Sequence, residues 1–174
     1  MRERVDRIVS YGAESIWVTT FHSTCVRILR RFIDLLGYER SFTIYDSDDQ
    51  KSLMKDICKH LNIDTKKYKE KTFLNAISSA KNELQTPEEY AAEVAKEYNK
   101  KIFGSVYKEY QRRLQQNNAL DFDDLIMKTV ELFQKEPEVL RQYQERFRYL
   151  LVDEYQDTNT AQFMLLSLLA SRYR

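Results

Sequence analysis

Apolar residues recur every three or four positions along most of the chain, a spacing that places them on one face of a helix. It predicts helices over residues 2–11, 26–36, 47–61, 122–134 and 160–171, a long helical region over 86–117, and a short helix from Pro137. Ser47 and Thr86 are each followed three residues later by Gln or Glu, which indicates capping boxes. Gly37 can end the second helix in a left-handed cap.

Two segments near the ends of the chain have a different pattern. Residues 16–21 are rich in β-branched and aromatic side chains, and residues 149–152 form an unbroken apolar run followed by Asp153 and Glu154. Such runs are typical of strands buried on both faces of a parallel sheet. The sequence therefore predicts a mainly α protein, with a helical subdomain inserted into an incomplete parallel α/β domain.

Glycine and proline are scarce. The chain has three glycines and two prolines, too few for the frequent turns of an all-β protein. The widely separated glycines also cannot form a G-x-x-x-x-G-K-[ST] phosphate loop or a G-x-G-x-x-G turn. We therefore expect no phosphate-binding loop within these 174 residues.

Charge and cysteine content limit the partners and the cellular compartment that the protein can have. The 28 lysines and arginines nearly balance the 27 acidic residues, so a nucleic-acid partner would need a local basic patch. Cys25 and Cys58 make no disulfide framework, which favours a reducing, intracellular compartment. No apolar run reaches the roughly 20 residues of a membrane span, and the N-terminus has no signal-peptide core. We therefore expect a cytoplasmic protein without a membrane partner.

Asp153 and Glu154 are the strongest candidates for chemistry. They follow the second predicted strand, at the edge where open α/β sheets bind their ligands. In nucleoside triphosphatases one carboxylate at this position holds Mg²⁺ through water, and a second acid takes the proton of the attacking water. Asp153 suits the first role and Glu154 the second. The alternative is that both acids only solvate the end of a strand.

Four segments together carry a family resemblance. Leu151–Asn159 (L-V-D-E-Y-Q-D-T-N), with Gln162 beyond it, resembles motif II of the UvrD/PcrA-like superfamily 1 DNA helicases. Thr19–Ser23 (T-T-F-H-S) resembles the T-F-H-[SG] motif of that family. Leu120–Leu125 (L-D-F-D-D-L) and Ser79–Glu83 (S-A-K-N-E) are similar to two further signatures, and their order agrees along the whole chain.

The resemblance implies a fragment of an ATP-dependent 3′–5′ DNA helicase, acting in DNA repair or plasmid replication. It implies a P-loop-type motor domain (1A) at residues 1–21 and 148–174, with the helical 1B subdomain at residues 22–147. ATP and Mg²⁺ are the cofactors it implies for the intact parent, with Gln156 and Asp157 linked to the nucleotide. The P-loop, the arginine finger and the second motor domain are not among these residues, so we expect the fragment alone to be inactive and to bind no cofactor.

The resemblance also implies partners, namely single-stranded DNA, the junction of single- and double-stranded DNA, and the rest of the helicase chain. Thr20, Phe21, His22 and Ser23 match the segment that runs close to the single strand in the family. Thr20 and His22 could contact a phosphate and Phe21 could stack on a base; the alternative is that Phe21 is core and His22 only begins a helix.

Basic residues offer a second DNA-binding candidate. Lys66, Lys67, Lys69 and Lys71 form the densest cluster, which could contact duplex phosphates. Two other groups lie on predicted helices: Arg27, Arg30 and Arg31, and Lys108, Arg112 and Arg113. Most such groups are solvated helix faces, and that alternative stays open for all three.

Two metal-site interpretations are weaker than structural ones. Asp121, Asp123 and Asp124 lack the glycine and further oxygen ligands of a calcium loop, and acids in the first turn of a helix complement its dipole. We therefore expect Asp121 to be an N-cap. His22 with Cys25, and Cys58 with His60, lack the spacing of a zinc site, so we expect packed cysteines.

A function of another class remains possible from the sequence. The chain could be a non-catalytic helical protein-interaction module in which Asp153 and Glu154 only end a strand. In either case we expect the central helices to carry their own core and to fold autonomously. The two terminal segments lack sheet neighbours, so we expect them to pair with each other, to fray or to associate with another copy.

Overall fold

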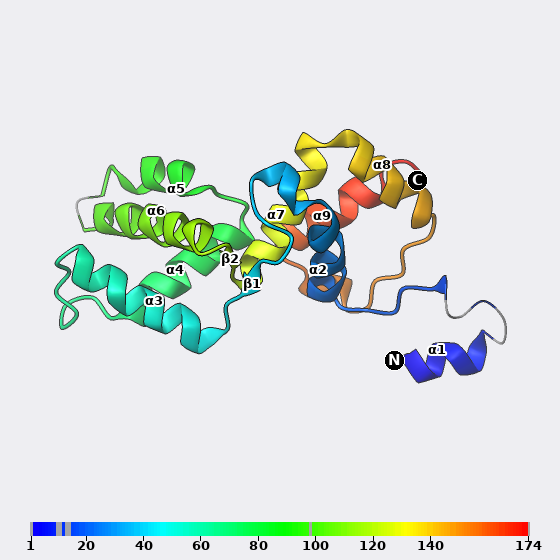
Figure 1. Ribbon diagram of the computed structural model, residues 1–174, viewed down its shortest axis with the longest axis horizontal. Coiled ribbons are helices and arrows are strands. Elements are labelled where there is room, and N and C mark those ends of the chain that lie inside the picture. Colours follow the sequence, from blue (N-terminus) through cyan, green and yellow to red (C-terminus); the bar gives the residue numbers. More distant parts are fainter. Residues whose placement is uncertain (1, 10–11, 13–14, 98, 174) are drawn as a thin grey trace.

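A computed structural model gives the fold of the chain and describes residues 2–9, 12, 15–97 and 99–173. Helices form two lobes side by side, and α1 (Arg2–Ile8) stands apart from both (Figure 1). One lobe, here the α7 lobe, contains α2 (Phe21–Phe32), the 3-10 helix η2 (Ile33–Leu36), α7 (Phe122–Lys135), α8 (Pro137–Arg146) and α9 (Thr160–Ala170). The other, here the α6 lobe, contains α3 (Ser47–His60), α4 (Glu70–Asn82), α5 (Pro87–Val94) and α6 (Lys101–Gln116).

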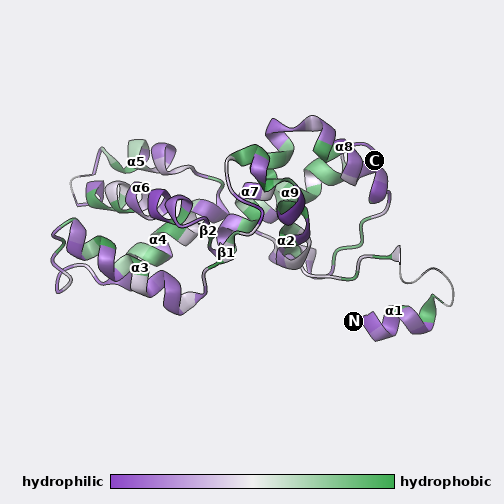
Figure 2. Ribbon diagram, in the orientation of Figure 1, coloured by the Kyte–Doolittle hydropathy of each residue, from purple (hydrophilic) through white to green (hydrophobic). Residues whose placement is uncertain are grey.

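Each lobe encloses its own hydrophobic cluster. In the α7 lobe the cluster is centred on α2 and α7, and includes Ile28, Leu29, Leu132, Phe133 and Leu165. In the α6 lobe it includes Ile57, Phe73, Val106, Tyr110 and Leu114. By contrast, none of the described residues of α1 is buried, and Figure 2 shows α1 as hydrophilic along most of its length. The ten core residues that helical spacing selects are buried, except that Leu61 is only partly so; they are Leu53, Ile57, Leu61, Phe73, Ile77, Val106, Tyr110, Leu114, Leu125 and Leu132.

Helix caps follow the sequence closely at three of four predicted positions. Thr86 and Asp121 each form a capping box, with Glu89 and Asp124 respectively. Gly37 ends η2 in the left-handed conformation, with a φ of 82°. The predicted box at Ser47 is wrong by one residue, because Asp46 is the N-cap of α3. Its carboxylate accepts from the backbone N–H of Asp48 and Asp49 at 2.8 and 2.9 Å, and a charged acceptor binds orphan amides more strongly than a hydroxyl does.

The two predicted strands are absent. Residues 17–20 and 149–152 have no regular hydrogen bonding, and Tyr149 and Leu151 are 92% and 100% exposed. A parallel strand requires a hydrogen-bonded neighbour, and no described residue pairs with either segment. Instead, side chains hold the first segment. Trp17 packs edge-on against Phe147 with a centroid distance of 5.0 Å.

A short parallel pair, not predicted from the sequence, joins the lobes. β1 (Thr43–Ile44) lies beside β2 (Ala119–Leu120), with Thr43 opposite Ala119. The N–H of Thr43 donates to the carbonyl of Asn118 at 2.9 Å. Two residues are too few to produce an alternating pattern, so the sequence carries no periodic signal for this pair.

The predicted helical region over 86–117 is two helices rather than one. α5 ends at Val94 and α6 begins at Lys101, so the chain folds back and the two helices pack together (Figure 1). Gly104 allows the close approach: a Cβ there would lie 2.8 Å from the Cα of Ala91. Tertiary packing therefore overrides a continuous helical pattern. The first predicted helix ends earlier than residue 11, at Ile8, and positions 10 and 11 lie outside the described residues.

A buried ionic cluster links the lobes. Lys81, at the end of α4, lies 2.8 Å from Asp121 and 2.9 Å from Asp124, and all three side chains are almost fully buried. Tyr110 donates to Asp121 at 3.0 Å and the Gln111 amide donates to Asp124 at 3.1 Å. The expected structural role of Asp121 and Asp124 is therefore confirmed, since their carboxylates are occupied by the Lys81 ammonium group and by helix capping.

Burial and charge act in opposite directions in this cluster. Burial alone lowers the pKa of a lysine, but the adjacent carboxylates of Asp121 and Asp124 outweigh it and raise the pKa of Lys81. Burial, together with the negative charge of Asp121, raises the pKa of Asp124. Two carboxylates thus share one ammonium group, and the cluster depends on Lys81 remaining charged.

Candidate nucleotide and DNA site

The acidic turn, defined here as residues 153–157, connects the irregular segment 147–152 to α9. Asp153 accepts from the backbone N–H of Glu154 at 3.1 Å. Glu154 adopts the left-handed conformation with a φ of 51°, and η3 (Tyr155–Asp157) follows it. A non-glycine residue in this conformation costs on the order of 1–3 kcal/mol and is often found at functional sites. The turn therefore keeps Glu154 in an uncommon backbone geometry.

The acids of this turn are free to bind a ligand. Asp153, Glu154, Gln156 and Asp157 are exposed, and no ion pair of the described residues includes their carboxylates. The Gln156 amide lies 3.5 Å from Asp157, so the structure brings the four predicted nucleotide-site residues together in one turn. Carboxylate oxygens are the ligands that Mg²⁺ prefers, usually with several waters retained. The residues present therefore fit a hydrated Mg²⁺.

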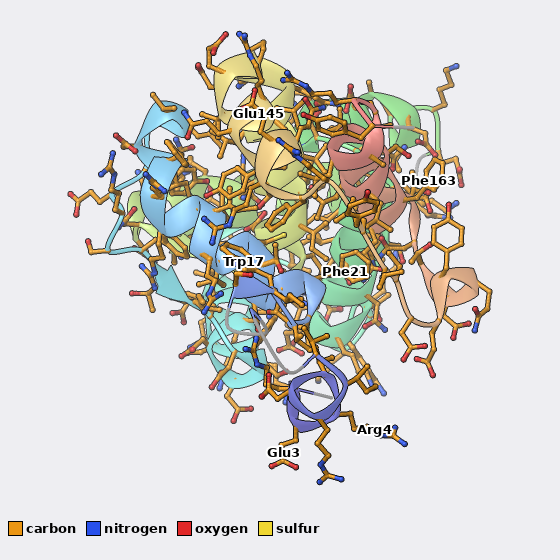
Figure 3. The ribbon with its side chains drawn as sticks, turned by 90° about the vertical axis from the view of Figure 1, so that its right-hand side faces the viewer. Glu3, Arg4, Trp17, Phe21, Glu145 and Phe163 are labelled. Carbon is orange, nitrogen blue, oxygen red and sulfur yellow. The ribbon has the colours of Figure 1, made fainter. Side chains whose placement is uncertain are left out.

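The predicted DNA-facing segment forms the start of α2. Thr20 is its N-cap, accepting from the backbone N–H of Ser23 at 3.2 Å. Thr20 and Ser23 are exposed, whereas Phe21 and His22 are half-buried. Phe21 packs against the cluster of the α7 lobe, as the structural alternative predicted. Figure 3 shows Phe21 and Trp17 on the face of the molecule that is turned toward the viewer.

An exposed aromatic residue beside this segment was missed from the sequence. Phe122 begins α7 and is 48% exposed. Its ring meets the ring of His22 edge-on, with a centroid distance of 5.9 Å. The sequence did carry a signal: Phe122 directly follows the N-cap Asp121. A side chain in the first turn of a helix need not face the core, so this ring could have been expected at the surface.

Asp123 completes the surroundings of His22. Burial raises the pKa of Asp123, while a hydrogen bond with Ser78 and the nearby His22 oppose the shift. Among the described residues no three histidine, cysteine or acidic side chains lie close enough to hold a metal together. Cys25 and Cys58 are both buried, as expected for packed thiols, and burial raises the pKa of each.

The four lysines of the predicted basic cluster lie in the loop between α3 and α4 and at the start of α4. Lys66 and Lys67 are in the loop, Lys69 is the N-cap of α4 and Lys71 is in its first turn. All four are exposed, and no ion pair of the described residues includes them. Figure 1 places this loop at the far end of the α6 lobe, away from the acidic turn. The structure thus separates the two predicted functional regions.

Arginines of the other two basic groups make contacts within the fold. Glu109 pairs with Arg112 and Arg113, and the Arg112 hydrogen bond lowers the pKa of Glu109 to about 2. On α2, the Arg27 guanidinium lies over the Trp17 ring at 4.8 Å, and Arg30 covers the Phe42 ring at 3.8 Å. These arginines therefore have roles within the fold.

Comparison with known proteins identifies the class. The UvrD/REP helicase N-terminal domain matches residues 1–174, and the chain belongs to this family. Its relatives include the ATP-dependent DNA helicase PcrA of Staphylococcus aureus (strain NCTC 8325 / PS 47), 55% identical over 174 residues. The protein of the same name from Staphylococcus epidermidis (strain ATCC 12228 / FDA PCI 1200) is 52% identical over 174 residues. Both alignments cover 100% of this chain, which spans 24% of the length of either relative.

The match agrees with the resemblance carried by the four sequence segments. The structure brings two of these segments into contact, because Lys81 of Ser79–Glu83 pairs with Asp121 of Leu120–Leu125. No helix within the described residues is both long enough and apolar enough to span a lipid bilayer.

Proposed function

We propose that this chain is part of an ATP-dependent 3′–5′ DNA helicase and contributes the acidic side of its nucleotide site. The observation that carries the proposal is the acidic turn. Asp153 and Glu154 are exposed there, and no ion pair among the described residues includes them. Membership of the helicase family supports it, as do relatives named ATP-dependent DNA helicases. Residues 1–21 and 148–174 are proposed as motor-domain (1A) segments, and residues 22–147 as the helical 1B subdomain.

Each acid has its own proposed role. Asp153 would hold Mg²⁺ through water, and Glu154 would accept the proton of the attacking water. Gln156 and Asp157 would orient the nucleotide from the same turn. Mg²⁺ bound with ATP supplies charge neutralisation at the phosphates. This chain has no phosphate loop in its sequence, so we propose that residues 1–174 alone do not hydrolyse ATP.

DNA is the proposed macromolecular partner. Thr20, His22 and Ser23 would contact the phosphates of a single strand, and Phe21 would support them from the core. The exposed ring of Phe122 adds a stacking surface beside His22. Lys66, Lys67, Lys69 and Lys71 would contact the duplex ahead of the single strand. Phe122→Ala should weaken binding of single-stranded DNA without changing the affinity for ATP. Unchanged DNA binding would show that Phe122 is not part of the DNA-binding surface.

The proposed setting is the cytoplasm, in DNA repair or replication, where both cysteines remain reduced. The experiment that tests the proposal measures ATP hydrolysis by the full-length helicase with and without single-stranded DNA. We expect hydrolysis that DNA stimulates and unwinding of a duplex with a 3′ single-stranded tail. A protein-interaction module would show neither activity, and that result would contradict the proposal.

A further inference from the structure

Three consecutive residues at the end of α4 bind the starts of two other helices. Lys81 pairs with Asp121 and Asp124 at the start of α7. The side-chain carbonyl of Asn82 accepts from the Asn159 amide at 2.8 Å. The carboxylate of Glu83 accepts from the Thr160 hydroxyl at 2.7 Å. The end of α4 therefore holds the first residues of both α7 and α9.

Asn159 is bound on two sides. Its side-chain oxygen caps α9 by accepting from the backbone N–H of Gln162 at 2.9 Å, while its amide nitrogen donates to Asn82. The N–H of Asn159 in turn donates to the side chain of Gln162 at 3.2 Å. One side-chain amide group thus joins the start of α9 to the end of α4.

The same contacts reach the acidic turn over a short path. The N–H of Asp157 donates to the carbonyl of Glu154 at 2.9 Å, and the hydroxyl of Thr158 donates to the carbonyl of Tyr155 at 2.8 Å. This hydrogen-bonded turn connects Glu154 to Asn159. Within the described residues, Asn82 and Glu83 supply the side-chain hydrogen bonds that tie residues 147–160 to another helix.

α4 belongs to the α6 lobe, but the residues at and just beyond its end contact the α7 lobe. Phe73, Ile77 and Ala80 pack in the cluster of the α6 lobe. Leu84, just beyond α4, packs against the cluster of the α7 lobe and adopts the left-handed conformation with a φ of 59°. A leucine retains this conformation only where surrounding contacts impose it. α4 therefore connects the cluster of the α6 lobe to the start of α9 by direct contacts.

We propose that Asn82 and Glu83 are positioning residues that couple the α6 lobe to the acidic turn. This inference rests on the proposed function, since it concerns the same nucleotide site. When DNA binds the α6 lobe through its lysine loop, a shift of α4 changes the position of Asn159 and Thr160. Asp153 and Glu154 then reach their hydrolytic arrangement, so DNA binding sets the rate of hydrolysis.

The test measures kcat and KM for ATP in the full-length helicase, with and without DNA that carries a duplex and a 3′ single-stranded tail. Asn82→Leu removes the acceptor for Asn159, whereas Asn82→Asp keeps an oxygen at that position. Asn75→Leu, at an exposed position of the same helix, is the matched control. We expect Asn82→Leu to lower DNA-stimulated kcat about tenfold, within the usual range of coupling between sites, with KM changed less than about twofold. Asn82→Asp should recover most of the lost kcat. In the same way, Glu83→Leu should lower DNA-stimulated kcat, and Glu83→Gln, which keeps an acceptor oxygen, should recover most of it.

Each outcome decides the inference. Unchanged stimulation in Asn82→Leu would overturn it, and so would equal losses in Asn82→Leu and Asn82→Asp, because the acceptor would then not be the cause. An inactive wild-type helicase would contradict the proposed function instead. Hydrogen exchange in the 174-residue chain tests the link without activity. There Asn82→Leu should speed exchange at residues 159–162 about tenfold and leave α3 unchanged; no change at 159–162 would overturn the inference.

Discussion

The ammonium group of Lys81, at the end of α4, lies 2.8 Å from the carboxylate of Asp121, the N-cap of α7. The two residues are 40 positions apart, and both are buried. Their pairing joins the lobes at the point where α4 also contacts α9. The ionic cluster thus lies next to the contacts of Asn82 and Glu83 that hold the start of α9, directly after the acidic turn.

Lys81→Met should destabilise the protein by about 3–5 kcal/mol at neutral pH, because it leaves two buried carboxylates without their cation. Burial already raises the pKa of Asp124, and loss of the Lys81 ammonium group, which opposes that shift, raises it further. The folded state then binds protons more readily than the unfolded state, so the deficit shrinks as the pH falls toward 4.

Urea unfolding of Lys81→Met and wild type at several pH values measures this deficit. Lys51→Met is the control, because the Lys51–Asp48 pair is exposed and should contribute less than about 1 kcal/mol. A deficit that stays constant between pH 7 and pH 4 would mean that the two carboxylates are not the groups left unpaired.

Gly104→Ala should destabilise the protein by about 1–3 kcal/mol, although alanine is the better helix former. The added Cβ would meet the Cα of Ala91 at 2.8 Å, so α5 and α6 would have to separate. Ser105→Ala, on the exposed side of α6, is the matched control and should not destabilise. Thermal unfolding of both variants is the measurement, and an equal or higher Tm for Gly104→Ala would contradict the packing described here.

Hydrogen exchange should be slow in α3, α6, α7 and α9 and fast in residues 149–158. α9 is included with the slow group because Ala161, Leu165 and Leu169 are buried against the α7 lobe. This differs from the expectation drawn from the sequence, in which the whole C-terminal segment lacked sheet neighbours and could fray. Uniform slow exchange through 149–158 at low concentration, in a demonstrated monomer, would show that this segment is held by contacts other than those seen.

Helices and caps were predictable because their signals are local. The spacing of Leu53, Ile57 and Leu61 placed α3, and Thr86 and Asp121 marked the starts of two further helices. The strands failed for the opposite reason: Tyr149–Val152 has the composition of a strand, but strand formation depends on a distant neighbour. The turn between α5 and α6 is another non-local effect, since no glycine or proline lies between Val94 and Lys101.

The candidate site was predictable in its residues but not in its arrangement. Asp153 and Glu154 follow an apolar run that the sequence shows directly, and the structure places both in one exposed turn. Lys81 stood out only as part of a family signature, because nothing near it in the sequence reveals that Asp121 lies beside it. Phe122 was missed since exposure of an aromatic side chain depends on how α7 packs.

Replacing Lys66, Lys67, Lys69 and Lys71 with glutamine should weaken binding of the full-length helicase to DNA that contains a duplex. For every phosphate that a lysine no longer neutralises, the slope of log affinity against log salt should become shallower by about 0.9. Lys100→Gln with Lys135→Gln is the control, because both lysines pair with glutamates. Fluorescence anisotropy at several salt concentrations measures the effect. Unchanged affinity and slope would identify the cluster as a solvated surface only.

The role of Glu154 is the central claim, and Glu154→Gln in the full-length helicase tests it most directly. The amide keeps the size of the side chain but cannot take a proton from water. The measurement compares the Kd for ATP with the rate of its hydrolysis in the same preparation. We expect a Kd within about threefold of wild type and a rate lower by about 10²–10⁴-fold, the usual contribution of a general base. Loss of ATP binding, or hydrolysis at the wild-type rate, would contradict the account.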